Sequence, residues 1–189
     1  HLERMPQQAV QSVFTHAQLL SRVCPAELVD FSLSVLRKKL PVVVQKEMRG
    51  RDYLISHSFS NFEWDHLSID DYFSFSPSAP TREPFHSLLM QAPDQGRRLI
   101  REIANHAIRS WRQLHRLAHH KEGTPIPLVM QFPWGRQVFW GDSRLYLGAR
   151  GLFGSSTVNS GWMALEEWAF REIDKGTPVD DILKAVLEG

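Results

Sequence analysis

The stretch that decides the fold is DQGRRLIREIANHAIRSWRQLHRLAHH, residues 94–120. Its apolar residues recur at intervals of three and four, the spacing that places side chains on one face of an α-helix. These residues are Ile100, Ile103, Ala104, Ala107, Trp111, Leu114 and Ala118. Asp94 is a suitable N-cap and Gly123 a suitable stop. The sequence therefore predicts a long central helix from about Asp94 to His120.

The opposite side of this predicted helix is basic. Residues 94–122 carry seven Lys and Arg residues against three Asp and Glu residues, a net charge of +4. Such a face can contact nucleic-acid phosphates. It can also be solvated or paired with acids of the same chain, and residues 162–188 have a net charge of −4. We favour the solvated or paired face and keep nucleic-acid binding through residues 97–121 as an alternative. The arginines in question are Arg98, Arg101, Arg109, Arg112 and Arg116.

Helices are predicted on both sides of the central one. Residues 7–23 and 25–41 indicate a helical hairpin, because a proline is tolerated in the first turn of a helix and stops a helix further along. Near the other end, a helix is predicted to begin near Ser160 and to end at Gly176, with a short final helix after Pro178. The apolar stripe predicted for the helix after Ser160 consists of Met163, Leu165, Trp168, Ala169 and Ile173.

Short β-prone runs and one irregular segment complete the chain. Residues 42–59 favour a β-hairpin, and residues 128–147 favour a small antiparallel meander or extended segments. Residues 60–87 have no helical period but are rich in aromatic rings, which a polar disordered linker would lack. The sequence thus predicts a mainly α fold within 1–189, a single domain with helical hairpins at both ends around a long central helix and short β segments.

The aromatic-rich loop of residues 60–87 is a candidate interaction site. Aromatic side chains are enriched at protein–protein interfaces, and the candidate residues here are Phe62, Trp64, Tyr72 and Phe73. The same loop carries four acids, and paired carboxylates among rings are also what glycoside hydrolysis uses. These acids are Glu63, Asp65, Asp70 and Asp71. A hydrolase-like enzyme fragment therefore stays open as an alternative to partner binding.

A Gly- and Ser-rich stretch, GARGLFGSSTVNSG at residues 148–161, raises the question of a phosphate loop. It lacks the lysine of a P-loop and the glycine spacing of a dinucleotide site. We favour a turn and helix cap here, with anion binding at the following helix N-terminus as the alternative. The candidate anion-binding residues are Arg150, Ser155, Ser156 and Ser160. No cofactor, metal site or catalytic residue is predicted.

Composition limits the remaining classes. The net charge is +1, so no overall field indicates nucleic acid or a membrane. No apolar run approaches the length of a membrane span, and no signal peptide is predicted, because the first ten residues lack an apolar h-region. The single cysteine, Cys24, fits a reducing compartment, so a cytoplasmic location is predicted. The chain begins with His1 and stops directly after a helical pattern, which suggests a fragment of a longer protein.

The run FPWGRQVFWGD, with YLGARG and SGWMALEEWAFREIDKG after it, lies within residues 125–176. It resembles a helical segment of large multidomain bacterial proteins that carry a STAND-type nucleotide-switching module. The resemblance implies a sensor or scaffold segment of an immune-type protein and transfers no functional residue. We therefore expect a non-enzymatic interaction, sensor or scaffold module whose partner is another protein or another domain of the same chain.

Overall fold

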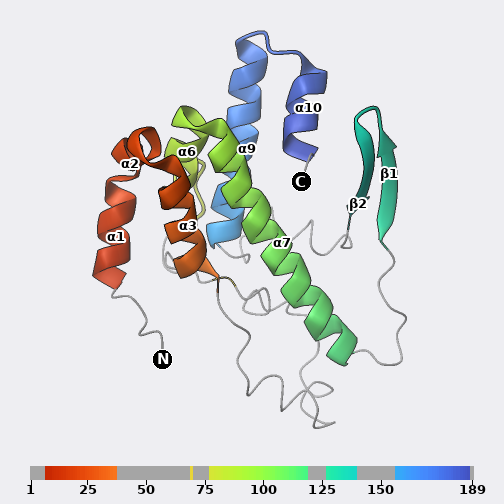
Figure 1. The fold of residues 1–189 in the computed structure, drawn as a ribbon, viewed down its shortest axis with the longest axis horizontal. Helices are drawn as coiled ribbons and strands as arrows, with labels where there is room; N and C mark the ends of the chain where they lie inside the picture. The colour runs from red at the N-terminus through yellow and green to blue at the C-terminus, as the bar shows by residue number, and fades with distance from the viewer. Residues whose placement is uncertain (1–6, 38–68, 70–76, 119–126, 140–155, 188–189) are drawn as a thin grey trace.

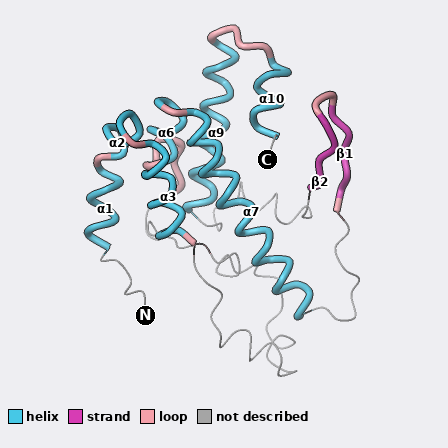
Figure 2. Tube along the Cα trace, viewed as in Figure 1, coloured by secondary structure: helices cyan, strands magenta, loops and turns pink. Residues whose placement is uncertain are grey.

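The computed structural model describes residues 7–37, 69, 77–118, 127–139 and 156–187, with residues 111–118 described as helix without their side chains (Figure 1). Helices make up most of this part, and the strands form one antiparallel hairpin (Figure 2). The mainly α prediction is therefore confirmed. The elements are α1 (Gln7–Thr15), α2 (Ala17–Val23), α3 (Pro25–Leu36), α6 (Phe85–Gln91), α7 (Pro93–Ala118), β1 (Leu128–Phe132), β2 (Gly135–Phe139), α9 (Ser156–Asp174) and α10 (Val179–Leu187).

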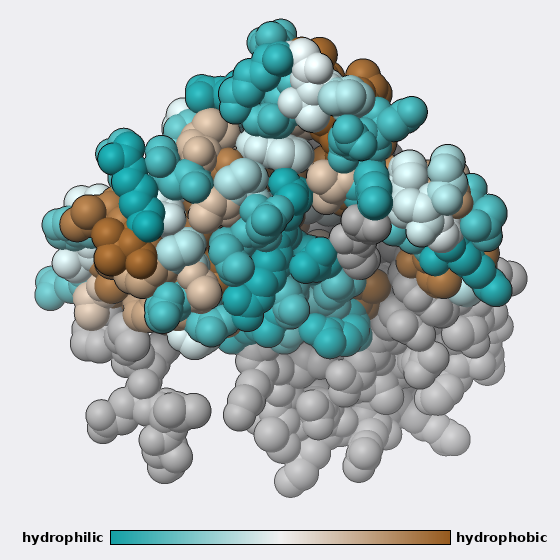
Figure 3. Space-filling model, turned by 45° about the horizontal axis from the view of Figure 1, so that its top comes forward, coloured by the Kyte–Doolittle hydropathy of each residue, from teal (hydrophilic) through white to brown (hydrophobic). Residues whose placement is uncertain are grey.

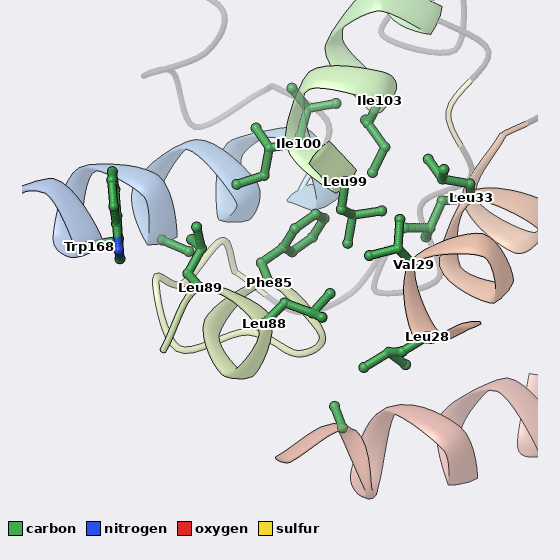
Figure 4. Close-up of a cluster of buried hydrophobic side chains, with 14 of the residues drawn as sticks. Leu28, Val29, Leu33, Phe85, Leu88, Leu89, Leu99, Ile100, Ile103 and Trp168 are labelled. Atoms are coloured by element: carbon green, nitrogen blue, oxygen red, sulfur yellow. The ribbon is translucent and has the colours of Figure 1, made fainter. Parts of the chain in front are cut away.

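The short helix α6 lies at the centre of the core. It packs against α2, α7 and α9, and α7 packs in turn against α3 (Figure 4). The core side chains come from all of these helices and include Leu28, Val29, Leu33, Phe85, Leu88, Leu89, Leu99, Ile100, Ile103 and Trp168. Phe85 is 1% exposed. Its prediction as part of an irregular loop was wrong, because α6 begins at this residue and turns its ring into the core.

The central helix runs from Pro93 to Ala118, close to the predicted bounds. The prediction that Asp94 is the N-cap of this helix was wrong. The backbone N–H groups of Gln95 and Gly96 donate to the carbonyl of Ala92, so the helix has already begun at Asp94. Asp94 lies in the first turn, where a negative charge is favourable, and forms an ion pair with Arg97.

The N-terminal helices differ from the prediction at two places. The helix expected over 7–23 is broken at His16, whose Nδ1 lies 2.8 Å from the carbonyl oxygen of Ser12. Pro25 begins α3 as predicted, but α3 ends at Leu36, five residues before the predicted end. Arg37 is extended and forms a β-bridge with Ile69. The hairpin predicted over 42–59 lies outside the described residues.

At the other end, α9 begins at Ser156, four residues before the predicted start. Ser160 is therefore inside the helix, fully buried, and its Oγ accepts a hydrogen bond from the backbone N–H of Ala79 at 3.1 Å. A Cβ added at Gly161 would lie 3.2 Å from the ring of Phe85. The small residues of this stretch thus permit close packing against residues 77–85. Residues 156–161 thus belong to the helix and not to the predicted turn, while residues 148–155 lie outside the described residues.

The remaining C-terminal elements follow the prediction. Gly176 closes α9 with a φ of +84°, a conformation that glycine adopts without strain, and its N–H donates to the carbonyl of Ile173. Helix α10 follows at Val179. Strands β1 and β2 pair antiparallel with Leu128 opposite Phe139. Residues 144–147, where a further β run was predicted, lie outside the described residues.

Candidate functional site

Helix α9 has two apolar faces. Its inner face buries Val158, Ala164 and Trp168 in the core. Four other large apolar side chains remain in contact with solvent: Trp162 is 38% exposed, Met163 37%, Phe170 60% and Ile173 42%. At 100° per residue these four lie within an arc of about 100°, which also contains the exposed Glu166 and adjoins Val158 of the core face at Trp162. The single stripe predicted from the sequence was wrong in placing Met163 and Ile173 with Trp168.

Helix α10 also carries exposed apolar side chains. It buries Ile182, while Val179 is 54% exposed, Leu183 45% and Val186 37%. The spacing of these three residues, i, i+4 and i+7, places them on one face of α10, and the buried Ile182 at i+3 lies on that same face. Figure 3 shows hydrophobic side chains at the surface among hydrophilic ones at the top of the molecule, where α9 and α10 meet. We call the seven residues Trp162, Met163, Phe170, Ile173, Val179, Leu183 and Val186 the outer apolar face.

Acidic side chains surround the outer apolar face. Residues 156–187 contain six Asp and Glu residues against three Arg and Lys residues, a net charge of −3. Two of the acids are paired within α9 or at its end: Glu167 with Arg171 at 2.5 Å, and Glu172 with Lys175 at 2.7 Å. The hydrogen bond from Lys175 lowers the pKa of Glu172, and the hydrogen bond from Thr177 acts in the same direction.

Three further acids lie close to the turn between α9 and α10. Asp174 is the last residue of α9, and Asp180 and Asp181 lie in the first turn of α10. None of the three forms an ion pair with the described part of the chain. The turn end of this helical hairpin therefore combines exposed apolar side chains with three carboxylates that have no ion pair in the described part of the chain, two of them at the N-terminus of α10, which favours negative charge.

The predicted basic face of α7 is partly engaged by other side chains. Arg98 forms an ion pair with Asp30 at 2.7 Å, and the Nε of Arg109 donates to the carbonyl of Asn105 at 3.1 Å. Arg101 is exposed. Arg112 and Arg116 lie on the helix, but their side chains are outside the described part. Arg98 is thus paired with an acid of the same chain, although that acid is Asp30 of α3 and none of those in residues 162–188.

Two arginines outside the predicted set also bind within the protein. The guanidinium of Arg97 lies 4.9 Å from the centre of the Trp168 ring, a cation–π contact that joins α7 to α9. Arg37 pairs with Glu102, and its hydrogen bond lowers the pKa of that carboxyl. Arg37 also donates to the carbonyl of Glu102 at 3.0 Å. Neither contact could be predicted from the sequence, because both join residues distant in the chain.

Two of the four candidate anion-binding residues, Ser156 and Ser160, lie in the first turns of α9. Ser156 accepts a hydrogen bond from Nη1 of Arg82 at 3.3 Å, and Ser160 is buried under Ala79. Arg150 and Ser155 lie outside the described residues. Sequence reasoning did not identify Arg82, which also donates to the carbonyl of Pro77. The hydroxyls of Ser156 and Ser160 thus hold residues 77–82 against α9.

The candidate aromatic interaction residues Phe62, Trp64, Tyr72 and Phe73 lie outside the described residues. So do the loop acids that kept a hydrolase-like reading open, Glu63, Asp65, Asp70 and Asp71. The structure therefore neither assembles nor separates these two sets of side chains.

A cleft of about 520 Å³ opens between α2, α6 and α9. Its lining residues are Gln18, Glu83, His86, Ser87, Met90, Gln91 and Arg171. Glu83 accepts hydrogen bonds from both the backbone N–H and the Oγ of Ser87, at 3.1 and 2.5 Å. Arg171 is bound to Glu167 and to the sulfur of Met90. Glu83, Ser87 and Arg171 are thus bound to neighbouring side chains, and Gln91 accepts a hydrogen bond from Arg22. Ser87 donates to a carboxylate and not to His86, whose Nδ1 is buried without a hydrogen-bond partner among the described residues.

Neither a metal-binding cluster nor a membrane-spanning helix is present within the described ranges. No three His, Cys, Asp or Glu side chains there are grouped so as to hold a metal ion. Of the described helices, none combines the length and the apolar character needed to cross a membrane.

Comparisons with known proteins returned no match: no family model, no curated protein and no solved structure is similar to this chain. The resemblance to STAND-type proteins therefore stays a prediction.

Proposed function

We propose that the chain is a non-enzymatic protein-interaction module and that the outer apolar face of α9 and α10 is its contact surface. The observation that carries the proposal is the exposure of Phe170, 60% of whose surface is accessible, within a set of seven apolar residues. Single exposed apolar residues are ordinary, but contiguous apolar surfaces rimmed by polar residues are typical of interaction sites. Burial against a partner would remove this apolar surface from water.

The chain itself supplies a comparison. Helix α7 also has a core face, but the side of α7 that is turned away from the core carries arginines such as Arg98, Arg101 and Arg109. Helix α9 carries large apolar residues at the corresponding positions of its outer side. Because a solvated helix normally has polar residues there, the outer face of α9 is better suited to a partner than to water.

A module of this kind fits a sensor or scaffold segment within a larger multidomain protein, as the resemblance to STAND-type bacterial proteins implies. Its partner is then another protein or another domain of the same chain. The location that goes with this role is the cytoplasm, which the single cysteine Cys24 supports.

The test is a selection of binding peptides from a random displayed library against the immobilised chain. We expect enriched peptides whose binding is lost in Phe170→Asp, because a carboxylate at the centre of the contact would be buried without a partner. The matched control is Leu19→Asp on α2, which introduces the same charge at an equally exposed apolar position (61%). Both variants should unfold at the temperature of the wild type. If no enriched peptide depends on Phe170, the proposal is wrong.

A further inference from the structure

The outer apolar face has the features that would select one class of partner. We infer that it binds a basic amphipathic helix, which would lie along α9 and α10 near the turn that joins them. This inference rests on the proposed function, because it assigns the partner of that same surface. Its three supports are the secondary structure of the surface, its charge and its length.

The secondary structure of the surface favours a helical partner over an extended one. An extended peptide binds by adding a strand to an exposed sheet edge, where it pairs its backbone groups. The residues of the outer apolar face all lie on helices, whose backbone groups are already bound within the helix. A helical partner satisfies its own backbone and needs only side-chain contacts. Phe170, Ile173 and Leu183 provide apolar contacts of this kind on both sides of the turn.

The charge of the surface favours a basic partner. Asp174 stands at the C-terminal end of α9, where the helix carbonyls already carry partial negative charge. A carboxylate is unfavourable at that position, and a cation placed beside it would relieve the repulsion. Asp180 and Asp181 add two more carboxylates across the turn that form no ion pair with the described residues, although the N-terminus of α10 favours a negative charge there. Lys or Arg side chains at the edge of a bound helix would meet all three, whereas nucleic acid and anionic lipid would be repelled.

The length of the surface sets the size of the partner. From Trp162 to Ile173 the face extends about 16 Å along α9, which corresponds to three helical turns. A partner helix of three to four turns with apolar residues at i, i+3, i+4 and i+7 would cover it.

The experiment uses three synthetic probes measured by fluorescence anisotropy with the intact chain. The first is an 18-residue peptide of Leu and Lys with leucines at helical spacing; the second has Glu in place of Lys; the third is the first with a central proline that breaks the helix. We expect the first to bind at least tenfold more tightly than the other two. Phe170→Asp should weaken its binding at least tenfold, and Leu19→Asp should leave its binding unchanged.

Charge is tested separately with the triple variant Asp174→Asn, Asp180→Asn and Asp181→Asn. We expect this variant to bind the Lys peptide several-fold more weakly, with a smaller dependence on salt concentration. Equal binding of the Lys and Glu peptides, or of the intact and proline-broken peptides, would overturn the inference. So would self-association of the chain that Phe170→Asp abolishes, because it would assign the surface to a second copy.

The peptide selection tests the interaction surface and the basic helical partner separately. Enriched peptides that require Phe170 but are acidic, uncharged or rich in proline would overturn the basic-helix partner and leave the interaction surface standing. If no peptide requires Phe170, both the interaction surface and the basic-helix partner are wrong. Peptides that require Phe170 and carry Lys or Arg at helical spacing support both.

Discussion

Replacement of Gly96 by alanine reverses the effect expected from helix propensity. Gly96 lies in the first turns of α7, where alanine should stabilise the helix by up to about 1 kcal/mol. In the structure, however, a Cβ at Gly96 would lie 2.8 Å from the backbone nitrogen of Leu89 and 2.9 Å from its Cγ and Cδ2. These distances are shorter than a carbon atom tolerates, so α6 and α7 would have to move apart.

The loss of stability expected for Gly96→Ala depends on whether the atoms of Leu89 can move away from the new Cβ. Leu89 is 1% exposed and packed among the core residues, and its backbone nitrogen cannot rotate away as a side chain would. Overpacking of a core costs about 1–3 kcal/mol, and the upper part of that range applies where backbone must shift. After subtraction of the propensity gain, we expect a net loss of about 1–2 kcal/mol in the free energy of unfolding. For a chain of this length that lowers Tm by about 2–8 °C.

Thermal unfolding followed by circular dichroism provides the measurement. The matched control is Gly161→Ala in α9, which has the same helical context and propensity gain. Its new Cβ would lie 3.2 Å from a ring carbon of Phe85, and a side chain can shift by the few tenths of an ångström required. We expect a change smaller than that of Gly96→Ala. If Gly96→Ala unfolds at or above the wild-type temperature, the close packing of α6 on α7 is refuted.

Three further predictions concern the core and its polar contacts. Phe85→Ala should lower the free energy of unfolding by about 3–5 kcal/mol in denaturant titration, because the ring is fully buried. Ser160→Ala should cost about 1–3 kcal/mol by leaving the N–H of Ala79 without its acceptor, and hydrogen exchange at that amide should accelerate. Glu102→Gln should cost about 0.5 kcal/mol at neutral pH, since the pair with Arg37 is partly exposed. Because the folded pKa of Glu102 is lowered, this difference should persist above its ordinary value of 4.5 and disappear as the pH falls through the lowered pKa; a difference that grows in acid would contradict the pairing.

The elements that could be predicted from the sequence are those with a strong local signal. The three-and-four spacing after Asp94 identified α7, and the prolines at 25 and 178 located the starts of α3 and α10. The β-hairpin at 128–139 followed from two short β-prone runs around Gly135. In each case the decisive residues are neighbours in the chain, so a local reading was sufficient.

The start of α9 could not be predicted because its small and polar residues are compatible both with a turn and with a closely packed helix. Glycine, serine, threonine and asparagine are typical of turns and caps, but they also permit two segments to approach closely. The difference depends on whether another segment passes there. In the structure Ala79, Arg82 and Phe85 do so, and all three are more than 70 residues away from Ser156 in the chain. The same reason explains why Arg82 and Arg97 were missed as contacts.

The outer face of α9 shows why the candidate surface needed the structure. Met163 and Ile173 are each five residues from Trp168, about 140° around the helix, so the single stripe predicted from the sequence merged faces that point in different directions. The packing of α9 on α6 and α7 decides that Trp168 is buried and that Ile173 is not. The helix thus keeps exposed apolar side chains that its own core does not need, beside three acids that form no ion pair with the described cations. A partner that is both apolar and basic complements both features together, whereas a partner with only one of the two would leave either apolar surface or negative charge uncompensated.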